Sequence, residues 1–289
     1  MVKAVSNILK RGIFMAVLSA MISSAALMRT INIKVFLPAD RINMDGTYDK
    51  EEKKYKTLYL LHGVLGSEND WLYRTNLIRY AEDKQIAVVM PAGENSYYID
   101  QPDVHANYEK MIAEDLVYLT RRLFPLSDKR EDTMIGGLSM GGYGALHIGL
   151  KYPDIFGRII GLSSADMTEI PEQLGMDAQF FRQPSFFKRI FGDVAAAKES
   201  SYNLSHLAKE TAAAGIMPEI YMACGLQDSL LTSNQRLYQS LKQLGYNVTY
   251  CETDGSHSWD FWDAQIKAAL SLIKDEGKHQ GMHSGNVGV

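Results

Sequence analysis

Short runs of consecutive apolar residues recur along the chain, separated by polar segments and by segments that contain Gly or Pro. Apolar runs without alternation predict strands that are covered on both faces. One earlier stretch, residues 30–37, instead alternates apolar and polar positions and predicts a half-buried strand that ends at Pro38. The runs that predict further strands are residues 57–61, 86–90, 133–135, 158–162, 219–224 and 247–251.

Segments with helical spacing of apolar residues separate most of these strands. The clearest is residues 108–124, where apolar side chains recur every three or four positions. Further helices are predicted over residues 69–83, 144–150, 230–244 and 259–274. Strands that alternate with helices predict an α/β fold, with a mostly parallel central sheet and helices on both of its faces.

Residues 163–217 interrupt this alternation. The segment mixes charged residues with a concentration of phenylalanines. We interpret residues 164–217 as an insertion over the top of the sheet, within a single domain that spans residues 15–275. The phenylalanines of the insertion are Phe180, Phe181, Phe186, Phe187 and Phe191.

The N-terminal region has two interpretations. Basic residues precede an apolar stretch, residues 13–27, that ends in small side chains, which resembles a signal peptide. Alternatively the native chain starts at Met15, residues 16–27 belong to the first strands, and residues 1–14 are an extension. The stretch is too short and too polar to cross a membrane as a helix. At the other end, residues 276–289 are rich in Gly, His and Ser and predict a disordered tail.

Composition narrows the classes of function. The 289 residues are 46% hydrophobic and 22% charged, as in ordinary globular proteins. A formal net charge of −4, with basic residues scattered along the chain, gives no basic field for nucleic acid. Cys224 and Cys251 do not have metal-ligand spacing, and a disulfide between them depends on whether their strand ends are neighbours. We expect neither a metal nor a cofactor.

One glycine-rich segment carries a candidate nucleophile. Residues 137–141 match the pattern G-x-S-x-G, with a predicted strand before and a predicted helix after, which is the context of a nucleophile elbow. Gly137 and Gly141 leave room for a strained turn. Such a turn exposes the Ser139 hydroxyl beside a helix N-terminus, whose N–H groups face a developing oxyanion. The alternative is a glycine-rich turn with an incidental serine.

A serine hydroxyl needs a base, and the base needs a carboxylate that orients it. With a nucleophile elbow, the carboxylate and then the histidine follow the serine along the chain. Asp228 follows the strand at residues 219–224, and His257 follows the strand at residues 247–251. Asp228 also fits the N-cap of the next helix, and Asp254 is a rival carboxylate.

Acyl transfer also needs two N–H donors for the oxyanion. One is the amide of Met140, which follows the nucleophile directly. The other is expected in the loop after the first buried strand, His62-Gly-Val-Leu-Gly66, where glycines let the backbone approach a substrate. Val64 is the predicted donor and Leu65 the alternative.

Taken together, these motifs resemble the putative-esterase branch of the α/β-hydrolases. That branch includes esterase D (S-formylglutathione hydrolase), tributyrin esterases, feruloyl esterases and mycolyltransferases, and the bacterial tributyrin esterases are the most similar. The resemblance covers residues 15–274. It rests on LLHGVLGSENDW (60–71), PAGENSYY (91–98), GLSMGGYGA (137–145), ACGLQD (223–228) and GSHSWDFW (255–262).

The resemblance implies an α/β-hydrolase fold and a serine carboxylesterase acting on small or short-acyl esters. By position, Ser139 is the nucleophile, Asp228 the acid and His257 the base, with Val64 and Met140 as oxyanion donors. Feruloyl esters, acetyl-sugar esters and S-formylglutathione are alternative substrates, and a non-catalytic binding scaffold is the alternative outside this class. Such esterases often begin with Met-Ala and a strand pair, which favours a start at Met15 and a cytoplasmic enzyme over a secreted one.

The phenylalanines of the insertion have two interpretations. They form a small core of their own, or at least one of the pairs Phe180–Phe181 and Phe186–Phe187 walls the acyl pocket and limits its depth. The expected partner is a small ester. A homo-oligomer is compatible with the sequence but is not predicted by it.

Overall fold

An eight-stranded sheet forms the centre of the molecule, with strand order β1-β2-β4-β3-β7-β8-β9-β10. The computed structural model describes residues 15–39, 47, 53–166 and 184–274. Along this order, the strands β4, β3, β7, β8, β9 and β10 pair in parallel, whereas β2 pairs antiparallel with both β1 and β4. The strands are β1 (Met15–Ser24), β2 (Arg29–Pro38), β3 (Lys56–Leu61), β4 (Ile86–Pro91), β7 (Thr133–Leu138), β8 (Arg158–Leu162), β9 (Glu219–Gly225) and β10 (Val248–Thr253).

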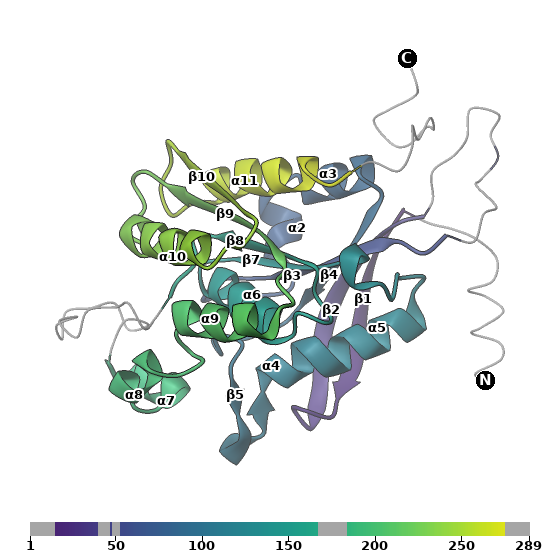
Figure 1. Cartoon of the computed structure of the whole chain (residues 1–289). Helices are drawn as coiled ribbons and strands as arrows, with labels where there is room; N and C mark the ends of the chain where they lie inside the picture. Colours follow the sequence, from purple (N-terminus) through teal and green to yellow (C-terminus); the bar gives the residue numbers. More distant parts are fainter. Residues whose placement is uncertain (1–14, 40–46, 48–52, 167–183, 275–289) are drawn as a thin grey trace.

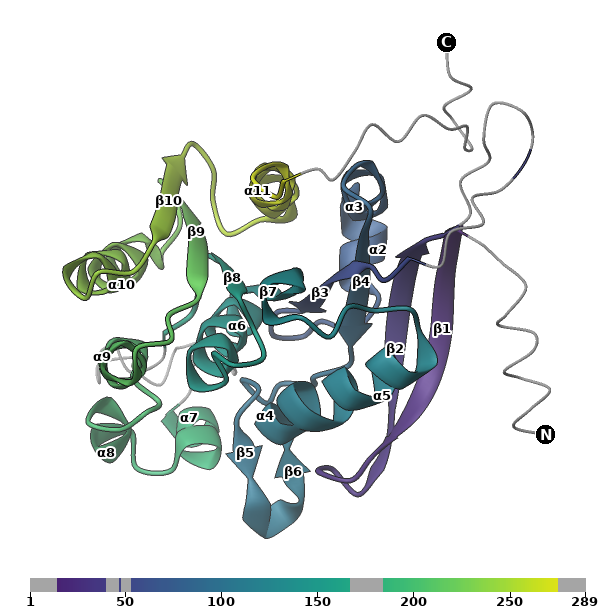
Figure 2. The same ribbon diagram turned by 45° about the vertical axis from the view of Figure 1, so that its right-hand side comes forward.

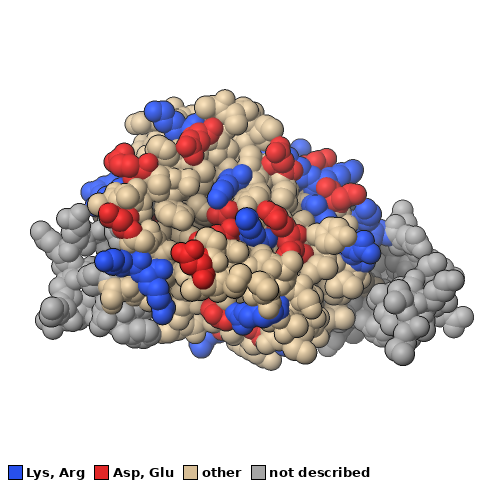
Figure 3. Space-filling model, turned by 90° about the horizontal axis from the view of Figure 1, so that it is seen from below, with Lys and Arg blue, Asp and Glu red and all other residues tan. Residues whose placement is uncertain are grey.

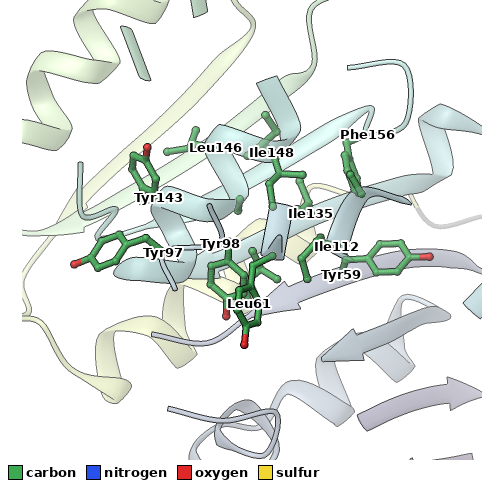
Figure 4. Close-up of a cluster of buried hydrophobic side chains, with 14 of the residues drawn as sticks. Tyr59, Leu61, Tyr97, Tyr98, Ile112, Ile135, Tyr143, Leu146, Ile148 and Phe156 are labelled. Atoms are coloured by element: carbon green, nitrogen blue, oxygen red, sulfur yellow. The ribbon is translucent and has the colours of Figure 1, made fainter. Parts of the chain in front are cut away.

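Helices cover both faces of this sheet (Figures 1 and 2). Helices α2 (Asp70–Arg74), α3 (Leu77–Asp83) and α11 (Trp259–Ser271) pack on one face. The opposite face carries α5 (Val117–Leu123), α6 (Met140–Lys151), α9 (Leu204–Ala214) and α10 (Leu231–Gln243). Each face buries its own hydrophobic cluster, and Figure 4 shows part of the larger one. The predicted α/β fold is therefore confirmed.

Two predicted helices are less regular than their spacing indicates. The helix expected over residues 69–83 is divided into α2 and α3. Thr75 causes the break, because its hydroxyl donates to the Trp71 carbonyl (2.6 Å) and accepts from the Leu77 amide (3.2 Å). The helix expected over residues 108–124 contains a π-helical turn, Met111–Leu116, between α4 (Tyr108–Lys110) and α5.

Within the N-terminal stretch that resembles a signal peptide, residues 15–24 form strand β1, which pairs with β2 over its whole length. The turn between the two strands is anchored to the domain, because Asp115 accepts hydrogen bonds from the Ser24 hydroxyl (2.6 Å) and the Ala26 amide (2.9 Å). Residues 1–14 and 275–289 lie outside the described residues, and so do the predictions made for them.

The described part of the insertion is helical. It contains α7 (Pro184–Phe191), α8 (Val194–Lys198) and α9, and residues 167–183 lie outside the described residues. Phe187 and Phe191 belong to the larger hydrophobic cluster of the domain. The interpretation that the phenylalanines form a separate small core is thus wrong for these two, because α7 lays them against aromatic side chains of the main core.

Candidate active site

Ser139 occupies the sharp turn between β7 and α6. Its backbone lies at φ 53° and ψ −118°, which is unusual for a residue with a side chain. A Cβ atom at Gly137 would come within 2.3 Å of the Gly141 carbonyl oxygen, and one at Gly141 within 2.5 Å of the His62 carbonyl oxygen. The turn is therefore possible only with glycine at these positions, as the sequence pattern predicts.

Ser139 and His257 meet in the folded chain, and Asp228 joins them. The Nε2 atom of His257 lies 3.0 Å from Ser139 Oγ, and its Nδ1 atom lies 2.8 Å from Asp228 Oδ2. The side chain of Asp228 is fully buried, whereas that of His257 is 36% exposed. The three residues thus form one continuous hydrogen-bonded chain that ends at a reachable hydroxyl.

Asp228 makes hydrogen bonds in two directions, although it is not the N-cap of α10, which is Leu230. Its Oδ2 atom faces His257, while its Oδ1 atom accepts from the Leu230 amide (2.9 Å) just before α10. Burial raises the pKa of the Asp228 carboxyl, but its hydrogen bonds, above all the one with His257, outweigh burial and hold the pKa below its ordinary value. Asp254 is exposed on the loop after β10 and does not join this chain.

The two predicted oxyanion donors come from different segments of the chain. Met140 is the first residue of α6, so its N–H has no carbonyl within the helix to bond. Val64 lies in the loop after β3, next to Leu65, whose own amide donates to Asn95 Oδ1 (2.8 Å). That bond occupies the Leu65 amide and favours Val64 of the two candidates.

His62 has a structural part in this loop that sequence analysis missed. It is buried, its Nδ1 lies 2.7 Å from the Gly63 carbonyl oxygen, and its Nε2 accepts from the Gly93 amide (2.9 Å). Nε2 must be unprotonated to accept, so Nδ1 carries the hydrogen and donates to Gly63. Burial lowers the pKa of His62, which preserves this neutral form. The signal in the sequence was the position of His62 directly before the glycine of the loop.

The imidazole of His62, together with the Gly66 amide (3.1 Å from the Gly63 carbonyl oxygen), thereby fixes the peptide group between Gly63 and Val64. In a trans peptide the carbonyl and the N–H point in opposite directions. Holding the Gly63 carbonyl therefore also sets the direction of the Val64 N–H.

An aromatic cluster lies behind the nucleophile turn. The Tyr97 ring contacts the rings of Phe186, Phe187 and Tyr143, with centroids 6.0–6.2 Å apart. The Tyr143 amide in turn donates to the Ser139 carbonyl (3.0 Å), and Figure 4 shows Tyr97 and Tyr143 side by side. Phe180 and Phe181, the other pair predicted to line the pocket, lie outside the described residues.

Several other features bear on function. Cys224 and Cys251 lie on neighbouring strands, but the register pairs Cys224 with Glu252, and both thiols are free. Within the described ranges, no group of three His, Cys, Asp or Glu side chains is arranged to hold a metal ion, and no helix is long and apolar enough to span a membrane. Acidic and basic side chains interleave on the face seen in Figure 3.

Comparison with known proteins places this chain in a family. The model of the family described as "Putative esterase" matches residues 24–273. The acetyl esterase of Caldicellulosiruptor saccharolyticus is 37% identical over 263 residues, which cover 90% of this chain and 98% of that protein.

Solved structures agree with this placement. The S-formylglutathione hydrolase of Staphylococcus aureus has a TM-score of 0.75 at 29% identity, over 90% of this chain and 98% of that one. A ferulic acid esterase has a TM-score of 0.69 at 23% identity, over 88% of this chain and 96% of that one, and this likeness concerns the fold. The chain belongs to the putative-esterase family and is an ester hydrolase with the α/β-hydrolase fold.

Proposed function

We propose that this chain is a serine carboxylesterase that hydrolyses short-acyl esters, acetyl esters first among them, through an acyl-enzyme intermediate. The observation that carries the proposal is the unbroken series of hydrogen bonds from Ser139 Oγ through the His257 imidazole to Asp228 Oδ2, with distances of 3.0 and 2.8 Å. A base within hydrogen-bond reach of a strained, accessible serine is the geometry that nucleophilic acyl transfer needs.

Acylation begins when Ser139 Oγ attacks the ester carbonyl carbon while His257 Nε2 takes the hydroxyl proton. The carbonyl oxygen becomes an oxyanion, which accepts hydrogen bonds from the amides of Val64 and Met140. The tetrahedral intermediate then collapses, and His257 gives its proton to the departing alcohol. The acyl group remains on Ser139.

Deacylation repeats these steps with water. His257 takes a proton from the water, the new tetrahedral intermediate collapses, and the proton returns to Ser139 Oγ as the carboxylic acid leaves. Asp228 stays ionised throughout, because its lowered pKa keeps it charged at neutral pH. It holds the hydrogen of His257 on Nδ1, which leaves Nε2 free to act as the base.

The size of the acyl group is proposed from the relatives. The name of the 37% identical relative supports an acetyl group, and that of the 29% identical structure supports a formyl thioester as the second candidate. Both acyl groups are small.

A hydrolysis panel tests this proposal. It would contain p-nitrophenyl esters from acetate to octanoate, methyl ferulate and S-formylglutathione, with Ser139→Ala as the background control. We expect the highest kcat/KM for acetate and a decline beyond butyrate. A maximum at octanoate or with methyl ferulate would contradict the short-acyl assignment, and S-formylglutathione far above acetate would select the second candidate.

We also propose that residues 15–24 remain in the mature enzyme, which favours a cytoplasmic location. Cleavage after Ala25 or Ala26 would remove β1 and expose the whole edge of β2. Mass spectrometry of the protein from its source cells tests this, and a mature chain that begins near Leu27 would contradict it.

A further inference from the structure

A buried asparagine of α10 binds the backbone of the loop that follows β8. The Oδ1 atom of Asn234 accepts from the Ser164 amide (3.1 Å), and its Nδ2 atom donates to the Ser164 carbonyl (3.0 Å). A residue of a neighbouring strand would bond both backbone groups of Ser164 in the same way. The side chain of Asn234 therefore holds this loop where the sheet has ended.

The Ser164 side chain is packed closely against the start of α6. A Cβ atom at Gly142, in the first turn of this helix, would come within 2.8 Å of Ser164 Oγ, and one at Gly161, in β8, would come equally close. Contacts as tight as these transmit a displacement, because the interior leaves no free space to absorb it. A shift of Ser164 would therefore reach the turn that carries the nucleophile.

The next residue of the loop binds the nucleophile turn directly. The Ala165 amide donates to the Ser139 carbonyl (3.0 Å), which also accepts from the Tyr143 amide (3.0 Å). The bond from Tyr143 belongs to the ordinary pattern of the α-helix, whereas the bond from Ala165 comes from outside the helix. Ala165 thus connects the residue that Asn234 holds to the catalytic serine.

The Ser139 carbonyl shares its peptide group with the Met140 amide, one of the two proposed oxyanion donors. No cis peptide bond occurs among the described residues, so the Met140 N–H points away from the Ser139 carbonyl. A hydrogen bond that fixes the direction of this carbonyl therefore also sets the direction of the N–H.

The loop around Ser164 has further supports. The Ser163 amide donates to the Ala223 carbonyl (2.7 Å), and the Asp166 amide donates to the Ser164 carbonyl (3.1 Å). In addition, Ser163 Oγ accepts from an indole N–H of α11 (3.1 Å). Because these bonds do not depend on Asn234, its loss should loosen the loop but leave it folded.

The other end of the same amide lies near the catalytic acid. Asn234 Nδ2 also donates to the Leu230 carbonyl (2.9 Å), which accepts from the Asn234 amide (3.1 Å) and Ser233 Oγ (2.9 Å) as well. The Leu230 amide in turn donates to Asp228 Oδ1. A test must therefore separate an effect on the Met140 amide from an effect on Asp228.

We propose that Asn234 is a positioning residue of the oxyanion site. Through Ser164 and Ala165 it keeps the peptide group between Ser139 and Met140 turned so that the Met140 N–H faces the substrate oxyanion. The inference rests on the proposed function, because that function assigns this amide its role as a donor. Asn234 acts through the backbone, since its Oδ1 and Nδ2 atoms are both bonded there.

Two variants separate the two ends of the Asn234 amide. Asn234→Leu has a similar size and removes all three side-chain hydrogen bonds. Asn234→Ser removes both bonds to Ser164, but its hydroxyl can still donate to the carbonyl four residues earlier, that of Leu230. An action through Ser164 should therefore make the two variants alike, whereas an action through Leu230 should spare Asn234→Ser.

Thr211→Val is the matched control. Thr211 is buried in α9, and its hydroxyl donates to the Leu207 carbonyl of its own helix (2.9 Å) and to the Leu150 carbonyl of α6 (2.7 Å). It thus joins a helix to the backbone of another element, as Asn234 does, but near the end of α6 that is remote from Ser139. Circular dichroism and urea unfolding check that each variant is folded.

Both Asn234 variants should lower kcat for p-nitrophenyl acetate about tenfold or more with KM little changed, because the oxyanion forms only in the transition state. The inhibition constant of trifluoroacetone, which forms an oxyanionic adduct with an activated serine, should rise by a similar factor. The acidic limb of kcat/KM should keep its position, because the Asp228–His257 pair is unchanged. Thr211→Val should lose stability but keep the wild-type kcat and inhibition constant.

Folded Asn234 variants that match Thr211→Val in kcat and in inhibition by trifluoroacetone would overturn the inference. A loss of activity in Asn234→Leu that Asn234→Ser does not share, or a shifted acidic limb, would also overturn it, because either result places the effect on Asp228. If Asn234→Leu does not fold, Asn234→Ser decides. Failure of the proposed function looks different, since wild-type protein would then be inactive or Ser139→Ala fully active.

Discussion

The Nε2 atom of His257 lies 3.0 Å from Ser139 Oγ, although 118 positions separate the two residues in the chain. Parallel strands bring them together, because Ser139 follows β7, Asp228 follows β9 and His257 follows β10 at the same edge of the sheet. Each role in the proposed mechanism can be tested by changing one side chain at this edge.

The two rival carboxylates should behave differently. Asp228→Asn should lower kcat by several orders of magnitude, because an amide stabilises the wrong tautomer of His257. Asp254→Asn should change kcat less than about twofold, since that carboxylate is exposed and outside the hydrogen-bonded chain. Steady-state kinetics on p-nitrophenyl acetate measure both variants. The reverse ranking would move the catalytic acid to Asp254 and leave Asp228 with a structural role.

His62 should affect the transition state more than the substrate complex. His62→Ala removes one of the two donors to the Gly63 carbonyl and leaves the Gly66 amide (3.1 Å), so the Val64 N–H is held less firmly. We expect kcat to fall about tenfold to a thousandfold with KM little changed, as for the loss of one oxyanion donor. His206→Ala, an exposed histidine on α9, is the control. A rise in KM alone would mean that the loop binds substrate but does not stabilise the oxyanion.

Two phenylalanines of the aromatic cluster should have different effects, one on the stability of the fold and the other on the preferred acyl length. Phe187 is 6% exposed in the main core, so Phe187→Ala should cost about 3–5 kcal/mol in the free energy of unfolding. Phe186 is only partly buried beside Tyr97, and Phe186→Ala should instead move the acyl-length optimum toward longer esters. Urea unfolding and the p-nitrophenyl ester series measure the two effects. An unchanged length profile in both variants would place the pocket wall elsewhere.

A partly buried cluster of Glu109, His147 and the half-exposed Lys151 predicts a pH dependence of stability. Glu109 is 2% exposed and lies 2.8 Å from His147 Nε2 and from Lys151 Nζ. Burial raises the pKa of Glu109, but hydrogen bonds and charge interactions with these two residues outweigh it and lower the pKa to about 2.

A lowered carboxyl pKa stabilises the fold above the unfolded-state value, and this contribution is lost as pH falls toward the folded-state value. Wild-type stability should therefore decline between pH of about 4.5 and about 2. Glu109→Gln should lower the free energy of unfolding at pH 7, because Glu109 loses its charge interactions with His147 and Lys151, and the stability of this variant should decline less with acid. Urea unfolding at several pH values measures this, with the exposed Glu114→Gln as control. Parallel acid profiles for wild type and Glu109→Gln would contradict it.

Local patterns in the sequence predicted most of the strands and the sharp turn at Ser139. The apolar runs predicted the parallel strands, and the glycines around Ser139 predicted the turn, because both depend on neighbours in the chain. The break at Thr75 was missed, since a hydroxyl that bonds to the backbone leaves the apolar spacing unchanged. The structural part of His62 was missed because one of its hydrogen-bond partners, the Gly93 amide, follows a different strand.

The central claim is that Ser139 is the nucleophile and that His257 activates it. The most direct measurement is labelling with a fluorophosphonate ester, followed by peptide mass spectrometry to locate the adduct. We predict one adduct on Ser139 in the wild type, much slower labelling in His257→Ala, and none in Ser139→Ala. The control Ser256→Ala, which removes an exposed serine directly before His257, should label like the wild type. An adduct on another serine, or labelling of Ser139→Ala at the wild-type rate, would contradict the account.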